Sequence, residues 1–209
     1  MKTVLAETQY LPPIAYFAAI QGASEIVIER HEHYMKQSYR NRCHIRAVSG
    51  RENLIIPLTG KHGKTVITQV KIDYSQKWLN NHWRTVQSAY RNAPFFEYYA
   101  DELEKVLFQK MTFLYDLNMA LLSMCLGWLK WETAIKETTH FEKTPAFFVT
   151  DIRSRLNPKK TEHLDEFFTP APYAQVFGSN FEENLSLIDL IFCAGPSSSK
   201  IVKDSSPVK

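Results

Sequence analysis

Two short β-favouring runs with a helix between them, all within the first thirty residues, constrain the fold more than any other feature of the sequence. Thr3–Ala6 predicts a strand, and residues 14–21 (IAYFAAIQ) predict a helix that Gly22 ends. Residues 25–29 (EIVIE) are short and β-branched, which predicts a second strand. A helix that joins two strands over so few residues favours a parallel pair, so the chain is expected to open like an α/β protein.

The next part of the chain reads as antiparallel. Residues 41–48 and 54–58 predict a hairpin around a turn at Ser49-Gly50. Residues 65–72 carry apolar side chains on both faces, which predicts a further strand inside the sheet.

From Ser75 the apolar period changes to that of a helix. Leu79, Trp83, Val86 and Tyr90 form a stripe at helical spacing. Two more helices are predicted at residues 95–108 and 112–129, and the second of these is the most apolar. These segments predict a helical subdomain.

The return of the chain is less regular. Four elements are predicted there: a strand at residues 132–138, a short helix or turn at 150–156, an extended piece at 173–177 and a helix at 185–194. The polar residues 197–209 are expected to be frayed. The resulting fold class is α+β with an α/β-like N-terminal opening, in which a small mixed sheet (residues 1–74) carries a helical subdomain (75–130) and an irregular return (131–209).

Composition excludes several classes of protein. A hydrophobic content of 44% indicates a globular chain, and the net charge of +3 argues against nucleic acid as the main ligand. Cys43, Cys125 and Cys193 are far apart, so no CxxC metal or redox motif exists. The N-terminus lacks a signal peptide and the longest apolar run is too short to span a bilayer, which predicts a soluble cytoplasmic protein.

Residues 26–45 combine a strand-like start with many hydrogen-bond donors and titratable groups, as in the lining of a binding cleft. If the strand continues past residue 29, its period of two places Glu29, His31 and His33 on one face. These side chains could then bind a divalent metal. The alternative is a polar strand end whose histidines form local hydrogen bonds or face water.

The end of this segment is Tyr39-Arg40-Asn41-Arg42. On a strand, Arg40 and Arg42 share a face and Asn41 points the opposite way. Arginine binds carboxylate or phosphate through a rigid fork, so one of these sets is a candidate to face a cleft. The alternative is that the two arginines form surface ion pairs.

Two further groups are candidates for a site. His82 lies one helical turn after Trp78, at the edge of the apolar stripe, where it could act in acid–base chemistry or be purely structural. Gln9 and Tyr10 follow the first strand, near the carboxyl end of the sheet where ligands bind in α/β proteins. The GxGxxG, GxxxxGK[ST] and GxSxG motifs are absent, which argues against Rossmann, P-loop and hydrolase chemistry.

Several blocks, in order along nearly the whole chain, resemble the WbqC-like family. They are QYLPPIAYFAAI (9–20), IERHEHYMKQSYRNRC (28–43), LIIPL (54–58), HWRTVQSAYRNAPFF (82–96), FLYDLN (113–118) and YAQVFGSNFEENLSLIDLIFCAG (173–195). The resemblance implies one domain over residues 1–209. It also implies a link to surface-polysaccharide (O-antigen) gene clusters, for which a transferase that adds an amino acid such as glycine to a sugar has been suggested.

The same resemblance carries residues with it. The family's recurring polar positions correspond here to Gln9, Pro12, Asn41, Arg42, His82, Tyr90 and Asp189. Many relatives have an aspartate at the position of Glu29, which shortens its reach by one methylene.

Two hypotheses from different classes follow. In the first, the chain is an acyl- or aminoacyl-group transferase acting on an amino sugar or nucleotide-sugar, with His82 as general base and Asn41 and Arg42 holding the donor. The remaining substrate-binding candidates are Gln9, Tyr10, Glu29, Arg40, Trp78, Tyr90 and Asp189. In the second, the same cleft binds a sugar or peptide without catalysis. The sequence does not specify a cofactor or an oligomeric state.

Overall fold

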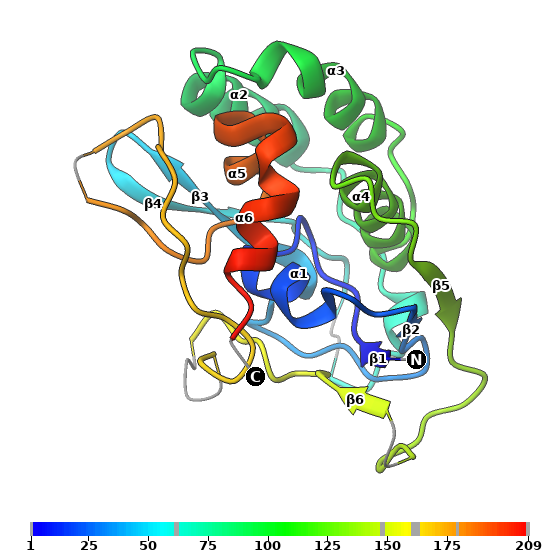
Figure 1. Cartoon of the computed structure of the whole chain (residues 1–209). Helices are drawn as coiled ribbons and strands as arrows, with labels where there is room; N and C mark the ends of the chain where they lie inside the picture. The colour runs from blue at the N-terminus through cyan, green and yellow to red at the C-terminus, as the bar shows by residue number, and fades with distance from the viewer. Residues whose placement is uncertain (1, 61–62, 147–148, 160–163, 179, 208–209) are drawn as a thin grey trace.

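Four parallel strands in the order β5-β2-β1-β6 form the main sheet (Figure 1). Their bounds are β1 Thr3–Ala6, β2 Glu25–Ile28, β5 Ala134–Glu137 and β6 Val149–Asp151. The structure is a computed structural model that describes residues 2–60, 63–146, 149–159, 164–178 and 180–207. Helix α1, Ile14–Ile20, joins β1 to β2, and these strands pair in parallel, so the predicted α/β-like opening is confirmed.

A separate antiparallel hairpin lies beside this sheet. Strands β3, Arg42–Ala47, and β4, Gly50–Ile55, pair as predicted, although β4 begins four residues earlier than expected. Gly50 has a φ of +113°, a conformation that side chains other than glycine's disfavour, which is why the turn falls there. The mixed α/β class is confirmed, with the parallel and antiparallel strands in two different sheets.

The strand predicted at residues 65–72 is wrong. This segment contains a 3₁₀ helix, η2 Ile67–Gln69, and makes only isolated bridges to other segments. Ile67 and Val70 are both fully buried, and a separation of three residues places them on the same side of a 3₁₀ turn. The apolar side chains therefore pack into the core from a 3₁₀ turn and not from a pleated strand.

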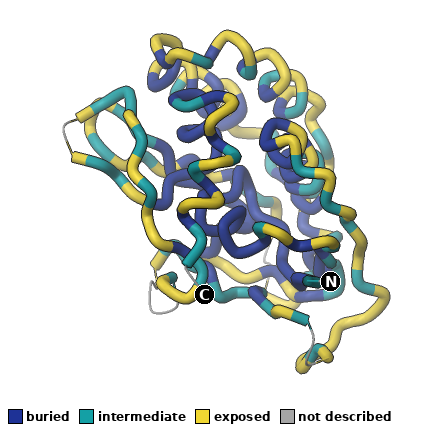
Figure 2. Tube along the Cα trace, viewed as in Figure 1, coloured by how far each residue is buried: buried dark blue, intermediate teal, exposed yellow. Residues whose placement is uncertain are grey.

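The helical layer follows the predicted apolar periods. Its main helices are α2 Trp78–Tyr90, α3 Phe96–Leu107, α4 Leu114–Trp128 and α5 Leu187–Ala194. The predicted stripe of α2 is buried, and the buried residues form a column through the centre of the molecule (Figure 2). The described hydrophobic core is one cluster that joins sheet and helices, and we propose on this basis that residues 1–209 form one domain.

The prediction of a frayed end is wrong for its first residues. A short 3₁₀ helix, η3 Gly195–Ser197, leads into α6 Ser198–Asp204, which packs against α1. Val202 of α6 is fully buried, and Ser198 and Ser205 are nearly so. The polar composition hid this contact because a single buried valine, Val202, suffices to anchor so short a helix. Residues 208 and 209 of the predicted frayed end lie outside the described part of the chain.

One smaller prediction also needs correction. Residues 150–156 begin as the last residues of strand β6 before they turn, because Asp151 pairs with Leu5 of β1. Residues 173–177 lie in an irregular segment that returns past the hairpin. Over the described residues, no helix is both long enough and apolar enough to cross a bilayer.

Docking of α6 can be tested at Val202. Val202→Ala is expected to lower the free energy of unfolding by about 1–3 kcal/mol, because it leaves a small cavity against α1. Urea unfolding followed by circular dichroism measures this change. The exposed neighbour Lys203 supplies the control Lys203→Ala. A Val202→Ala variant as stable as this control would show that the end is frayed.

Candidate functional site

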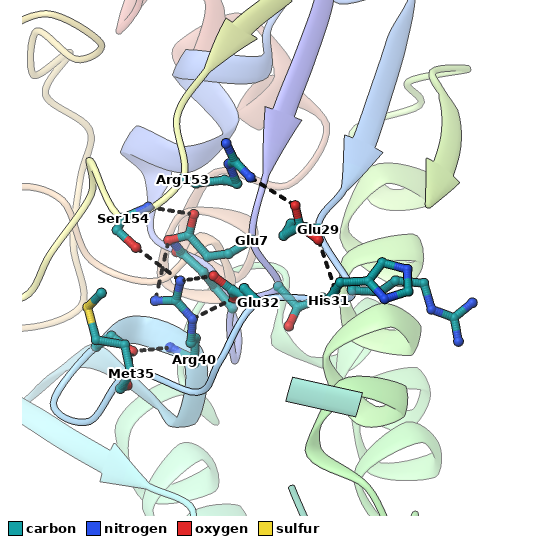
Figure 3. A network of polar contacts seen from close by, with 12 residues as sticks. Glu7, Glu29, His31, Glu32, Met35, Arg40, Arg153 and Ser154 are labelled. Carbon is teal, nitrogen blue, oxygen red and sulfur yellow. Dashed lines mark hydrogen bonds and ion pairs between the residues drawn. The ribbon is translucent and has the colours of Figure 1, made fainter. Parts of the chain in front are cut away.

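Each strand of the parallel sheet leads directly into a polar side chain at its carboxyl end. Glu7 follows β1, Glu29 follows β2, Thr138 follows β5, and Asp151 is the last residue of β6. Ligands of open parallel sheets bind at this edge, beside the point where the strand order reverses. Here the order reverses between β1 and β6, so Glu7 and Asp151 flank that point. Figure 3 shows the strands pointing into the resulting polar network.

Glu29 is fully buried and held through both carboxylate oxygens. Its Oε1 accepts hydrogen bonds from the backbone N–H of His31 and the hydroxyl of Thr138, both at 2.8 Å. Its Oε2 is ion-paired with the Arg153 guanidinium at 2.8 Å. The carboxylate is therefore fixed in one orientation by groups from three separate segments. Figure 3 shows the contacts with His31 and Arg153.

Arg40 is the second centre of the network, and it is 1% exposed. Its Nε and Nη2 donate to the two oxygens of Glu32 at 2.7 and 2.5 Å, and Nη2 also donates to Ser154 Oγ at 3.1 Å. Its Nη1 lies 4.0 Å from Glu7 Oε1. Burial raises the pKa of Glu32, and the hydrogen bond with Arg40 offsets part of that effect.

Arg153 connects the edge of the sheet to the loop that follows β5. Its guanidinium pairs with Asp151 and Glu29, and Nη2 donates to the backbone carbonyl of Glu142 at 2.8 Å. It also lies 5.1 Å from the centre of the Phe141 ring. Both loop contacts are with adjacent residues in the middle of the loop, and they hold it beside Glu29.

The network has an excess of negative charge. Four carboxylates face two guanidinium groups, which leaves two negative charges without a cationic partner inside the network; the residues are Glu7, Glu29, Glu32, Asp151, Arg40 and Arg153. A partly desolvated excess of this sign attracts a cation far more strongly than the same charges would in water.

A cleft of about 280 Å³ opens beside Glu29. Its floor is apolar and consists of Leu5, Val27 and Val149 from adjacent strands, and its outer wall is the loop of residues 138–146. Because the Glu29 carboxylate has no exposed surface, a ligand in this cleft reaches it by displacing one of its partners.

The structure divides the predicted site residues among separate places. Gln9, Glu29 and Arg40 belong to the network, and Gln9 Nε2 donates to Glu7 Oε1 at 2.9 Å. Arg40 precedes the hairpin in a 3₁₀ helix, η1 Tyr39–Asn41, so the prediction that Arg40 and Arg42 share a strand face is wrong. Arg42 instead begins β3.

His82 and Asn41, the predicted catalytic pair, do not contact each other in any interaction that the structure describes. Their side chains interact instead with the backbone carbonyls of two consecutive residues. Asn41 Nδ2 donates to the carbonyl of Ile56 at 2.8 Å, whereas His82 interacts with the carbonyl of Ile55. His82 Nδ1 lies 3.1 Å from the Tyr10 hydroxyl. Successive carbonyls of an extended segment point in opposite directions, so these two side chains approach it from opposite sides.

The surroundings of His82 are those of a buried aromatic cluster. The Trp78 ring lies 5.0 Å from its imidazole, and the histidine is 7% exposed. Burial lowers the pKa of His82 to about 4. Such an imidazole is neutral at physiological pH and is a weak base.

Tyr90 and Asp189 form a third, separate group at the base of α5. Asp189 accepts hydrogen bonds from the hydroxyls of Tyr90 at 2.6 Å and Tyr173 at 2.5 Å. The Tyr90 hydroxyl accepts from the backbone N–H of Arg46 at 3.0 Å. Burial raises the pKa of Asp189. This group ties the hairpin, α2 and the irregular return to α5.

The predicted alignment of Glu29, His31 and His33 on one strand face is wrong, because β2 ends at Ile28. The His31 ring lies 3.0 Å from the backbone carbonyl of Thr138, and His33 makes an isolated bridge with Val66. Within the described ranges, no three His, Cys, Asp or Glu side chains gather as a metal site would require.

Sequence reasoning missed several members of the network, including Glu7, Glu32, Thr138, Asp151, Arg153 and Ser154. Glu7 and Asp151 carry a usable signal, since each is an acid at the end of a short β-favouring run. Glu32 lies within the polar segment of residues 26–45, but nothing in the sequence distinguishes it there from its neighbours. Ser154 carries no signal, because only the tertiary fold brings it to Arg40.

The comparison with protein families decides the classification. The model of the WbqC-like protein family matches residues 8–161, which include every member of the network except Glu7. The chain belongs to the WbqC-like protein family. A relative of this chain, the uncharacterized protein Rv1507c of Mycobacterium tuberculosis, is 28% identical over 221 aligned residues, which cover 93% of this chain and 94% of that protein. No solved structure matches this WbqC-like chain.

The buried state of His82 predicts a pH dependence of stability. Its folded pKa of about 4 lies below the ordinary value of 6.5, so its contribution is present above pH 6.5 and is lost as the pH falls toward 4. Between about pH 7 and about pH 5 the loss amounts to about 2 kcal/mol. His82→Gln, which stays neutral, is expected to remove this part of the pH dependence in urea unfolding. An equal loss of stability between these pH values in the wild-type chain and in His82→Gln would contradict the assignment of this pH dependence to His82.

Proposed function

We propose that this chain is a transferase that joins an acyl or aminoacyl group to the amino group of an amino sugar or nucleotide-sugar, in surface-polysaccharide (O-antigen) biosynthesis. The biosynthetic context comes from the family resemblance. The single observation that supports the chemistry is the carboxylate-rich network at the carboxyl edge of the sheet, with Glu29 in the wall of a cleft. A protonated amine is the cation that such a network favours.

Glu29 is placed to bind this amine and to accept its proton. In the proposed step, the bound ammonium group first gives one proton to a carboxylate oxygen of Glu29. The free amine nitrogen then attacks the carbonyl carbon of an activated acyl group, and the bond to the leaving group breaks. The second proton passes from the nitrogen to the leaving group, and an amide results. Thr138 and the backbone N–H of His31 keep the carboxylate oriented throughout.

Access to Glu29 requires an exchange of cations. Arg153 occupies Oε2 of Glu29 and is also paired with Asp151, so it keeps a carboxylate partner when it withdraws. An incoming ammonium group then takes the place of the guanidinium at Oε2 of Glu29 and neutralises one of the two excess negative charges of the network. In this proposal Glu29 is the general base, the role that the sequence suggested for His82. Gln9 and Arg40 hold the network in place through hydrogen bonds to Glu7 and Glu32.

The apolar floor of the cleft supports a substrate with a carbon skeleton next to the amine. Leu5, Val27 and Val149 offer no hydrogen bonds from their side chains, so they suit the face of a sugar ring or an acyl chain. The polar side chains of the cleft, among them Glu29, Thr139 and His140, stand at the carboxyl end of the strands and in the loop wall.

The proposal is tested with Glu29→Gln. Calorimetry is done with a nucleoside-diphosphate amino sugar and with its N-acetylated counterpart, which carries no cation. The wild-type chain is expected to prefer the free amine by about tenfold or more, and Glu29→Gln is expected to lose this preference. With acyl or aminoacyl thioesters as donors, formation of the amide, detected by mass spectrometry, falls by about a hundredfold or more in the variant.

A matched control is Glu97→Gln, which removes an exposed carboxylate from α3. It should leave both the preference and the amide yield unchanged. If the wild-type chain binds the amine but never forms an amide with any donor, the non-enzymatic binding hypothesis replaces the transferase. Equal binding of the two sugars by the wild-type chain rejects the amine site itself.

A further inference from the structure

The face of the hairpin that is turned away from the core, called the outward face below, carries cations that the proposed reaction leaves unused. The segment that contains Phe177 and Glu182 covers part of it. Alternation along β3 places Arg42, His44 and Arg46 on one face, whereas Cys43 and Ile45 of the opposite face are buried in the core. The register adds Arg51 and Asn53 of β4 to the outward face, directly opposite Arg46 and His44.

These cations are only partly neutralised. Glu182 pairs with Arg46 at 2.9 Å and with Arg51 at 2.7 Å. Arg42 makes no ion pair with any residue that the structure describes, and its Nε is buried without a hydrogen-bond partner there. One carboxylate for three guanidinium groups leaves an excess of two positive charges, the opposite of the network around Glu29.

His44 provides a second, independent observation. It is 6% exposed, and its Nδ1 has no hydrogen-bond partner among the described residues. The Tyr39 ring packs edge-on against it, with ring centres 5.5 Å apart. A buried ring nitrogen without a partner is costly, and an oxygen acceptor bound between His44 and Arg42 would satisfy both groups.

The hairpin is physically connected to the network. The segment that carries Asp151 and Arg153 continues to Leu156 and Asn157, which line a small hollow of about 50 Å³ together with Tyr39 and Arg51. Arg40, in the turn that leads into β3, hydrogen-bonds with Ser154 of the same segment. One stretch of chain therefore borders both the negative network and the positive hairpin face.

We propose that Arg42, His44 and Arg51 form an anion subsite for a phosphate or diphosphate ester. The inference rests on the proposed function, because it identifies the acceptor as a nucleotide-linked amino sugar: its amine enters the cleft at Glu29 and its diphosphate lies on the hairpin face. Arginine binds two phosphate oxygens at once, and two positive charges match a diphosphate. The excess of opposite charges at the two places then orients the substrate.

The first test uses inorganic pyrophosphate as the probe, with the full-length chain in calorimetry at low ionic strength. Arg42→Gln is expected to weaken pyrophosphate binding by about tenfold or more. The matched control is Arg91→Gln, which removes an exposed arginine at the end of α2. Equal weakening by both variants, or no binding by the wild-type chain, overturns the subsite.

A second measurement does not depend on the folding of a variant. In the wild-type chain, pyrophosphate is expected to shift the NMR signals of the His44 imidazole, and an unchanged imidazole overturns the proposal. A nucleoside diphosphate and vesicles of phosphatidic acid serve as further probes. Competition by the nucleotide at equal or lower concentration than pyrophosphate supports the assignment, whereas binding to the vesicles alone rejects it in favour of a lipid headgroup.

The two proposals fail separately. Glu29→Gln leaves the hairpin face intact, so it should bind pyrophosphate as tightly as the wild-type chain even where amide formation is lost. Pyrophosphate binding without any amine preference would reject the proposed reaction and retain the subsite. Amine preference that survives in Arg42→Gln, together with unchanged pyrophosphate affinity, would reject the subsite alone.

Discussion

The buried guanidinium of Arg40 is the constraint on which the rest of the structure depends. A charge that is 1% exposed is tolerated only when carboxylates and hydrogen-bond acceptors surround it. Glu32, Glu7 and Ser154 meet that demand, and they come from the loop after β2, the end of β1 and the turn after β6. Burying this one side chain therefore obliges three strand connections to converge at the same edge of the sheet.

That convergence creates the asymmetry from which the function is inferred. Arg40 neutralises one of the two negative charges of Glu7 and Glu32, and Arg153 neutralises one of the two of Glu29 and Asp151. The edge of the sheet is therefore left negative. The 3₁₀ turn that contains Arg40 leads into β3, and the outward face of β3 is positive. A chain with a small overall charge of +3 thus separates its charges into two sites, which its composition does not reveal.

Local patterns predicted the elements well, and long-range contacts account for most of what they missed. The βαβ opening, the hairpin and the helices follow from periodicity and turn residues. The strand predicted at residues 65–72 was wrong, because the spacing of apolar residues such as Ile67 and Val70 in a short segment fits both a strand and a 3₁₀ turn. Gln9 could be singled out as a polar residue that follows a strand, and Glu29 and Arg40 as polar residues of the segment 26–45. Ser154 could not, because it lies 114 residues from the Arg40 that it contacts.

The central claim is that Arg40 organises this edge of the sheet, and its most direct test is the free energy of unfolding of Arg40→Met. Methionine fills a similar volume but leaves Glu32 buried and unpaired, so a loss of about 3–5 kcal/mol is expected in urea unfolding. The double variant Arg40→Met/Glu32→Gln should recover more than half of it, because the unpaired charge is gone. A loss below about 1 kcal/mol in Arg40→Met would contradict the account.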